Sequence, residues 1–116
     1  MSYPKIARLI TVLLQQTGNG SLKWDQTEHS DMFQASFPRF SVRIYQKDLN
    51  PIEIDYALQI INDEGEIVEE VSDPDLKHVL ENPYTKMRDL HDSARRSAMG
   101  VEEALDEILN FLEWHS

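Results

Sequence analysis

The chain of 116 residues contains no cysteine and only four glycines. Without cysteine it cannot be a disulfide-stapled scaffold, a zinc–thiolate module or an enzyme with a cysteine nucleophile. The glycines are scattered, so they form no phosphate-binding loop, and no serine stands in a nucleophile-elbow motif. These absences favour a non-enzymatic protein, and we expect it to bind no cofactor and no metal ion.

Basic residues are also scarce, because 11 Lys and Arg stand against 21 Asp and Glu, for a net charge of −10. Residues 1–58 carry six acids and six bases, so the whole excess belongs to residues 59–116. A clustered negative field repels nucleic acid and anionic lipid and attracts basic protein surfaces. We therefore expect a protein partner, with no nucleic acid and no membrane. The simpler interpretation of the charge is that it keeps a small protein soluble.

Long hydrophobic runs are missing as well. The longest apolar stretch, residues 9–14, is far below the ~20 residues that span a bilayer, and no signal-peptide cleavage site follows it. We therefore expect a cytoplasmic protein. Hydrophobic residues make up 41% of the chain, which is enough for one small core, so residues 1–116 are predicted to form a single α+β domain.

Apolar residues recur with the period of an α-helix in three segments, residues 4–16, 82–99 and 101–114, with a break or bend at Gly100. The first helix has only a narrow polar stripe of Arg8, Thr11 and Gln15. Such a helix must be almost enclosed, either by its own domain or by a partner. The last helix is the cleanest amphipathic segment, with an apolar arc of about 160° and acids opposite.

Between the first and second helices the period changes from 3.6 to 2. Alternation predicts strands over residues 32–37, 40–45 and 52–61, and an acidic edge strand over residues 66–72. One hairpin is predicted to pair Phe33 with Ile44, and the next to pair Ile44 with Ile52. The expected fold is α+β: an N-terminal helix, a four-stranded antiparallel meander, and two C-terminal helices packed on one sheet face.

One loop gathers acid–base groups around an imidazole. Asp25, Glu28, His29 and Asp31 could tune the histidine for general-base catalysis or hold a divalent metal. Their spacing matches no ligand motif, so a solvated polar loop is the simpler interpretation.

Apolar side chains in excess of the core carry a stronger signal. On the predicted phases, four of them project away from the core side: Trp24, Tyr45, Ile61 and Trp114. Aromatic residues on the surface of a small domain often mark partner contacts. Together with the nearly all-round apolar first helix, they favour a homodimer or a protein partner.

The chain also resembles a group of small uncharacterised bacterial proteins along nearly its whole length. The residues that carry the resemblance are Leu22-x-Trp24, Ile60-Ile61-Asn62-Asp63-Glu64-Gly65, Leu90 with Ala94-Arg95-Arg96, and Ala104-Leu105-x-x-Ile108-Leu109-x-x-Leu112. These are turn, strand and helix-packing motifs. The resemblance therefore implies an α+β fold of unknown function and brings no activity.

Three hypotheses follow from the sequence. The first is a non-enzymatic protein-interaction domain that forms a homodimer. The second is an acidic inhibitor of the immunity-protein type, or a protein similar to a secretion chaperone, that masks a basic or apolar partner. The third is a small enzyme or metal binder that uses loop 25–31.

Overall fold

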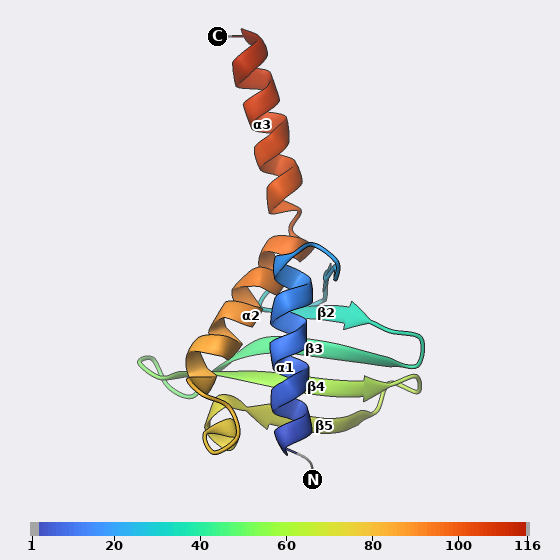
Figure 1. Cartoon of the computed structure of the whole chain (residues 1–116), viewed down its shortest axis with the longest axis vertical. Coiled ribbons are helices and arrows are strands. Elements are labelled where there is room, and N and C mark those ends of the chain that lie inside the picture. The colour runs from blue at the N-terminus through green and yellow to red at the C-terminus, as the bar shows by residue number, and fades with distance from the viewer. Residues whose placement is uncertain (1–2, 116) are drawn as a thin grey trace.

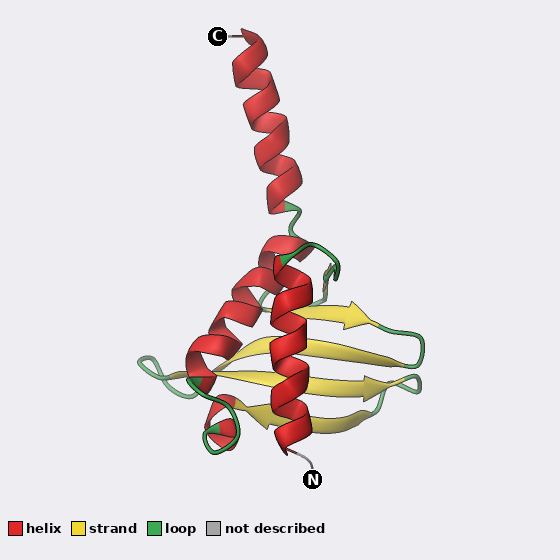
Figure 2. Cartoon of the chain, viewed as in Figure 1, coloured by secondary structure: helices red, strands yellow, loops and turns green. Residues whose placement is uncertain are grey.

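A computed structural model describes residues 3–115, which form one antiparallel sheet, three α-helices and a short 3-10 helix (Figures 1 and 2). Their order is α1 (Tyr3–Gly18), β1 (Asp25–Gln26), β2 (Met32–Ser36), β3 (Phe40–Asp48), β4 (Ile54–Asn62), β5 (Ile67–Ser72), the 3-10 helix (Asp73–Leu76), α2 (Pro83–Ala98) and α3 (Val101–His115). The α+β class and the antiparallel sheet are confirmed.

The sheet has five strands in the order β1-β2-β3-β4-β5, so the predicted count of four is wrong. The additional strand, β1, has only two residues and pairs Asp25 with Gln34. A two-residue strand is too short to produce an alternation that a sequence pattern can reveal. The predicted pairing of β2 with β3 is confirmed, with Phe33 opposite Ile44.

The predicted register of the next hairpin is wrong by six residues, because Ile44 lies opposite Leu58 and not opposite Ile52. The strand β3 has nine residues and is longer than expected, and β4, also of nine residues, begins at Ile54, two residues later than predicted, so that a loop of five residues lies between them. Asn50 stabilises that loop, since its side-chain oxygen accepts the backbone N–H groups of Ile52 and Glu53. The shift is even, so it preserves the apolar face, and it leaves Ile52 91% exposed.

The helices α1 and α2 cover one face of the sheet and pack side by side (Figure 1). The core lies between these two layers, and its fully enclosed side chains come from α1, β3, β4, β5, the 3-10 helix and α2: Ile10, Ile44, Leu58, Val71, Leu76, Met87 and Leu90. This two-layer arrangement buries the apolar stripe of each helix against the apolar face of the sheet.

The last helix departs from the expected fold. The prediction that both C-terminal helices pack on the sheet is correct for α2 and wrong for α3, which projects from the body and has no buried residue (Figure 1). The chain breaks at Gly100, whose φ of +66° lies in the left-handed region that ends helices. The sequence predicts the amphipathic pattern of α3 correctly, but the apolar side of this helix is not covered by the described residues of its own chain.

No helix in the described part of the chain combines the length and the hydropathy that a membrane crossing requires.

Candidate protein-binding surface

The most unusual surface of the molecule is the apolar face of α3. We use this name for five side chains on one side of the helix, each about half exposed: Leu105, Ile108, Leu109, Phe111 and Leu112. At 100° per residue they fall within the apolar arc seen in the sequence. Single exposed apolar residues are ordinary, whereas a contiguous row along a whole helix is a patch of the kind that interaction surfaces have.

The opposite side of α3 is acidic. Its carboxylates are Glu102, Glu103, Asp106, Glu107 and Glu113, and the helix contains no Lys or Arg. Two of these acids lie in the first turn, where the positive end of the helix dipole stabilises them. The helix therefore offers a partner one apolar face with carboxylates along its edges.

Short-range contacts fix the base of α3. The N–H of Met99 donates to the carbonyl of Arg95 at 2.9 Å, and the N–H of Ala104 donates to the carbonyl of Gly100 at 3.0 Å. The guanidinium of Arg96 reaches forward from α2 to Glu102 at 3.0 Å. These contacts join α3 to the end of α2 and leave the rest of the helix in solvent.

An isolated helix of this length is marginal in water. Helices shorter than ~12–15 residues are rarely stable without tertiary packing, and α3 has 15 residues. Its sequence has a strong apolar period, but within the described residues only its base contacts the end of α2, and none of its side chains is buried. A partner that covers the apolar face would supply the missing stabilisation.

The four residues predicted to contact a partner lie in three different environments. Trp114 is 85% exposed near the end of α3, as expected. Tyr45 is half-buried on the face of the sheet opposite the helices. The expected exposure of Ile61 is wrong: its phase on β4 points away from the helices, but it is buried on this central strand, whose neighbours are β3 and β5. Trp24 is also buried, which removes it from the exposed surface.

Trp24 is a structural anchor. Its indole N–H donates to the hydroxyl of Thr17 at 2.9 Å, and its backbone N–H donates to the hydroxyl of Ser97 at 2.9 Å. The ring belongs to the hydrophobic core. Trp24 thus connects the loop after α1 to the ends of both α1 and α2. This loop has no periodic pattern from which the burial of Trp24 could be inferred.

The polar loop at residues 25–31 does not form a compact site. Asp25, Glu28, His29 and Asp31 are all exposed, and the one close pair is His29 Nε2 with a carboxylate oxygen of Glu28 at 3.8 Å. Thr27 organises the loop internally, since its hydroxyl bonds to the backbone of His29 and Met32. Within residues 3–115, no three His, Asp or Glu side chains gather closely enough to hold a metal ion.

The open face of the sheet carries a polar network that sequence reasoning missed. The Tyr45 hydroxyl and the amide of Gln59 both donate to the same carboxylate oxygen of Glu70, at 2.9 and 2.7 Å. Burial, together with the hydrogen bond to the Glu70 carboxylate, raises the pKa of Tyr45 to about 12. Register brings these residues together from three strands, so only a correct pairing of β3, β4 and β5 could have revealed them.

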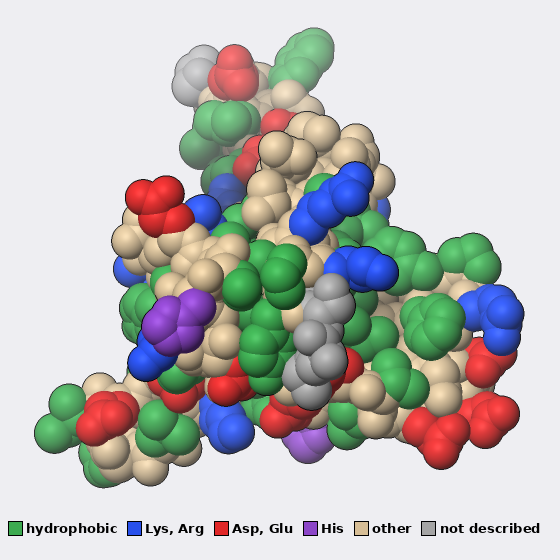
Figure 3. Space-filling model, turned by 60° about the horizontal axis from the view of Figure 1, so that its bottom comes forward, with side chains coloured by type: hydrophobic (Ala, Val, Ile, Leu, Met, Phe, Trp, Pro, Cys, Tyr) green, Lys and Arg blue, Asp and Glu red, His purple; other side chains and the backbone are tan. Residues whose placement is uncertain are grey.

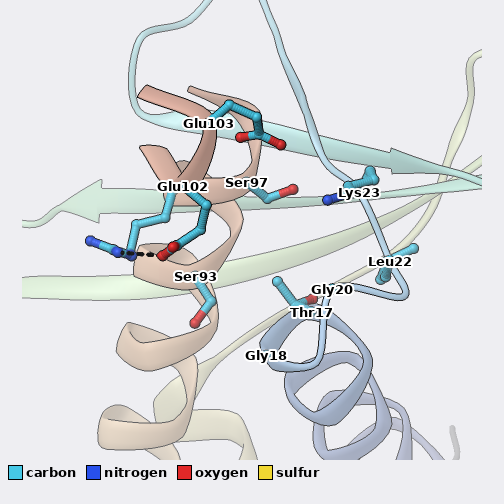
Figure 4. A pocket seen from close by; sticks show the side chains of 10 residues that line it. Thr17, Gly18, Gly20, Leu22, Lys23, Ser93, Ser97, Glu102 and Glu103 are labelled. Atoms are coloured by element: carbon cyan, nitrogen blue, oxygen red, sulfur yellow. Dashed lines mark hydrogen bonds and ion pairs between the residues drawn. The ribbon is translucent and has the colours of Figure 1, made fainter. Parts of the chain in front are cut away.

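Two clefts flank α2. The first, of about 270 Å³, lies where α1 ends and α3 begins, with Lys23, Ser97 and Glu103 around it (Figure 4). The second, of about 530 Å³, is lined by two arginines and two aspartates of α2 together with His91. The arginines there pair with the aspartates, and His91 Nε2 lies 2.8 Å from the carbonyl of Asp31. The charges of the second cleft therefore balance, which gives it no preference for an ionic ligand.

Comparisons of this chain with protein-family models, with curated proteins and with solved structures found no match. Function must therefore be argued from the surface itself, and the apolar face of α3 is its most distinctive feature.

Proposed function

We propose that this protein is a non-enzymatic protein-interaction module that forms a homodimer through α3. The observation that supports the proposal is the apolar face of α3, which no other part of the described residues buries. A symmetric pair of chains covers two such faces at once, and two-fold dimers are the commonest soluble assemblies.

The apolar area available sets the strength of such an association. Full burial of a Leu, Ile or Phe contributes ~1.5–3 kcal/mol, so each half-exposed residue of the apolar face retains about 1 kcal/mol. Two helices with five such residues each then supply about 10 kcal/mol, within the ~4–15 kcal/mol that association costs. Contact between the two α3 helices alone would therefore be marginal, and a stable dimer must bury further surface of the body.

Light scattering over a concentration series tests this proposal. We expect the mass of two chains at micromolar protein, with dissociation on dilution and little weakening in high salt, since apolar burial drives the contact. A protein that stays at the mass of one chain at every concentration would overturn the homodimer.

The acidic side of α3 favours a second candidate function. Five carboxylates without a Lys or Arg on that helix suit a protein that masks a basic partner, as immunity-type inhibitors and secretion chaperones do. Capture from a lysate at low and at high salt distinguishes this function, because charge-driven binding of a basic protein is lost as salt rises. Retention that does not change with salt would exclude it.

A further inference from the structure

One side of α1 is open. The buried residues Ile6, Ile10 and Leu13 define the centre of its inward face. Ala7 lies about 90° from that centre on one side and is buried, whereas Leu9 lies only about 70° away on the other side and is half-exposed. Val12, further round on the side of Leu9, is 42% exposed. The helix is therefore covered beside Ala7, where α2 packs, and uncovered beside Leu9 and Val12.

The sheet is bare on the same side. Along β3 the residues that face the helices change from Ile44 at 0% exposure to Val42 at 3% and Phe40 at 46%. Phe37, paired with Phe40 across the turn, is 42% exposed. The strands extend beyond α1 there, away from α2 (Figure 1), and hydrophobic side chains gather beside α1 on this part of the surface (Figure 3). We call this exposed apolar surface, formed by Leu9, Val12, Phe37 and Phe40, the α1 patch.

From these two surfaces we infer that the α1 patch packs against α3 of a second copy of this chain, so that two protomers exchange their last helices. The inference rests on the proposed homodimer and names the surface on the body that it uses. The lengths agree, because α3 has 15 residues and α1 has 16, or about 22 and 24 Å at 1.5 Å per residue. An exchange of helices buries part of the surface of α1 and the sheet as well as the apolar face of α3. This is the further buried surface that a stable dimer requires.

The α3 helix of the same chain does not cover the α1 patch. It projects from the body beyond the C-terminal end of α2, which is the element it contacts (Figure 1). A second copy of the chain can present its own α3 to this patch.

The charges of the two helices are complementary. Lys5 and Arg8 flank Val12 on the exposed side of α1, and α1 contains no acidic residue. The carboxylates along the edges of the apolar face of α3 would lie close to these two bases when its apolar residues contact Leu9 and Val12. Opposite charges at the rim of an apolar contact favour this pairing and its orientation.

Disulfide trapping tests the exchange, because the natural chain has no cysteine and each introduced thiol is unique. The double variant V12C/I108C places one thiol in the α1 patch and one in the middle of the apolar face of α3. On mild oxidation we expect a shift from one chain mass to two on a non-reducing gel. The single variants V12C and I108C should remain at one chain mass, and so should the control V12C/N110C, whose second thiol lies on the polar side of α3.

The other outcomes separate this inference from the proposed homodimer. If I108C alone is trapped as readily as the double variant, α3 pairs with α3, the homodimer stands and the exchange is wrong. A disulfide formed within one chain also overturns the exchange. If nothing is trapped while light scattering still gives two chains, only the exchange fails. If the protein is a monomer, both fail.

Discussion

The strongest test of whether the apolar face of α3 forms the dimer contact is to introduce a carboxylate at the centre of that face. Ile108 is the middle residue of α3 and is 56% exposed. In the proposed dimer the variant Ile108→Asp loses the roughly 1 kcal/mol that burial of the exposed half of the Ile108 side chain contributes to association. It also brings a carboxylate into an apolar contact, which costs about 2 kcal/mol or more. Both protomers carry the change, so the dimer is weakened by about 6 kcal/mol.

That loss corresponds to an increase in Kd on the order of 10⁴, since about 1.4 kcal/mol is a factor of ten. Sedimentation velocity over a dilution series measures it directly. The folded body should keep its free energy of unfolding to within about 0.5 kcal/mol, because Ile108 touches no core residue. Far-UV circular dichroism should lose helical signal, because an unpaired α3 is marginal in water.

The matched control is Asn110→Asp, which adds the same carboxylate to the polar side of the same helix. It should leave the dimer intact. If Ile108→Asp keeps the Kd of the natural chain, the apolar face is not the interface. If both variants dissociate equally, net charge and not apolar burial decides assembly, and the reasoning about α3 is refuted.

Three further predictions concern the body of the protein. Trp24→Phe and Thr17→Val each remove one partner of a buried hydrogen bond, and each should lower the free energy of unfolding, measured by urea denaturation, by ~1–3 kcal/mol. If the losses of the two variants add in the double variant, the bond contributes nothing to stability. Tyr45 should titrate near pH 12 by ultraviolet absorbance, and Glu70→Gln should lower that pKa; a titration at 10 would contradict the network. Since the folded pKa of Tyr45 lies above its ordinary value of 10.0, this stabilisation is complete below pH 10 and is lost as pH rises through 12. Leu90→Ala should cost 2–5 kcal/mol because Leu90 is fully enclosed, and a loss below about 1 kcal/mol would show that it lies outside the core.

Local patterns in the sequence located most of the secondary structure. The three helices and the β2–β3 hairpin were predicted close to their observed bounds, because each has a clear apolar period and a turn or break residue at its end. The register of β3 against β4 was not predicted correctly. The pairings of Ile44 with Ile52 and of Ile44 with Leu58 differ by an even number of residues, so both place the same apolar residues on the same face of the sheet. Only the short Asn50 turn, a feature of three-dimensional geometry, selects between them.

Part of the candidate protein-binding surface could also be predicted from local periodicity. The sequence identified Trp114 and the amphipathic face of α3, since both follow from helical phase alone. It misplaced Ile61, because phase says which way a side chain points and not what lies in front of it, and it misplaced Trp24, because the loop of Trp24 has no periodic pattern. The Tyr45 network could not be predicted, since it depends on the register of three strands.

The first and the last helix illustrate how far periodicity can determine burial. Both have broad apolar arcs in the sequence, and both would be expected to be enclosed. For α1 the sheet and α2 cover most of the arc and leave the strip of Leu9 and Val12 open, while α3 keeps its whole arc uncovered. Periodicity fixes which side chains of a helix need covering, but not whether its own chain or another covers them. In the proposed dimer a second copy of the chain covers both surfaces, and the disulfide-trapping experiment tests this.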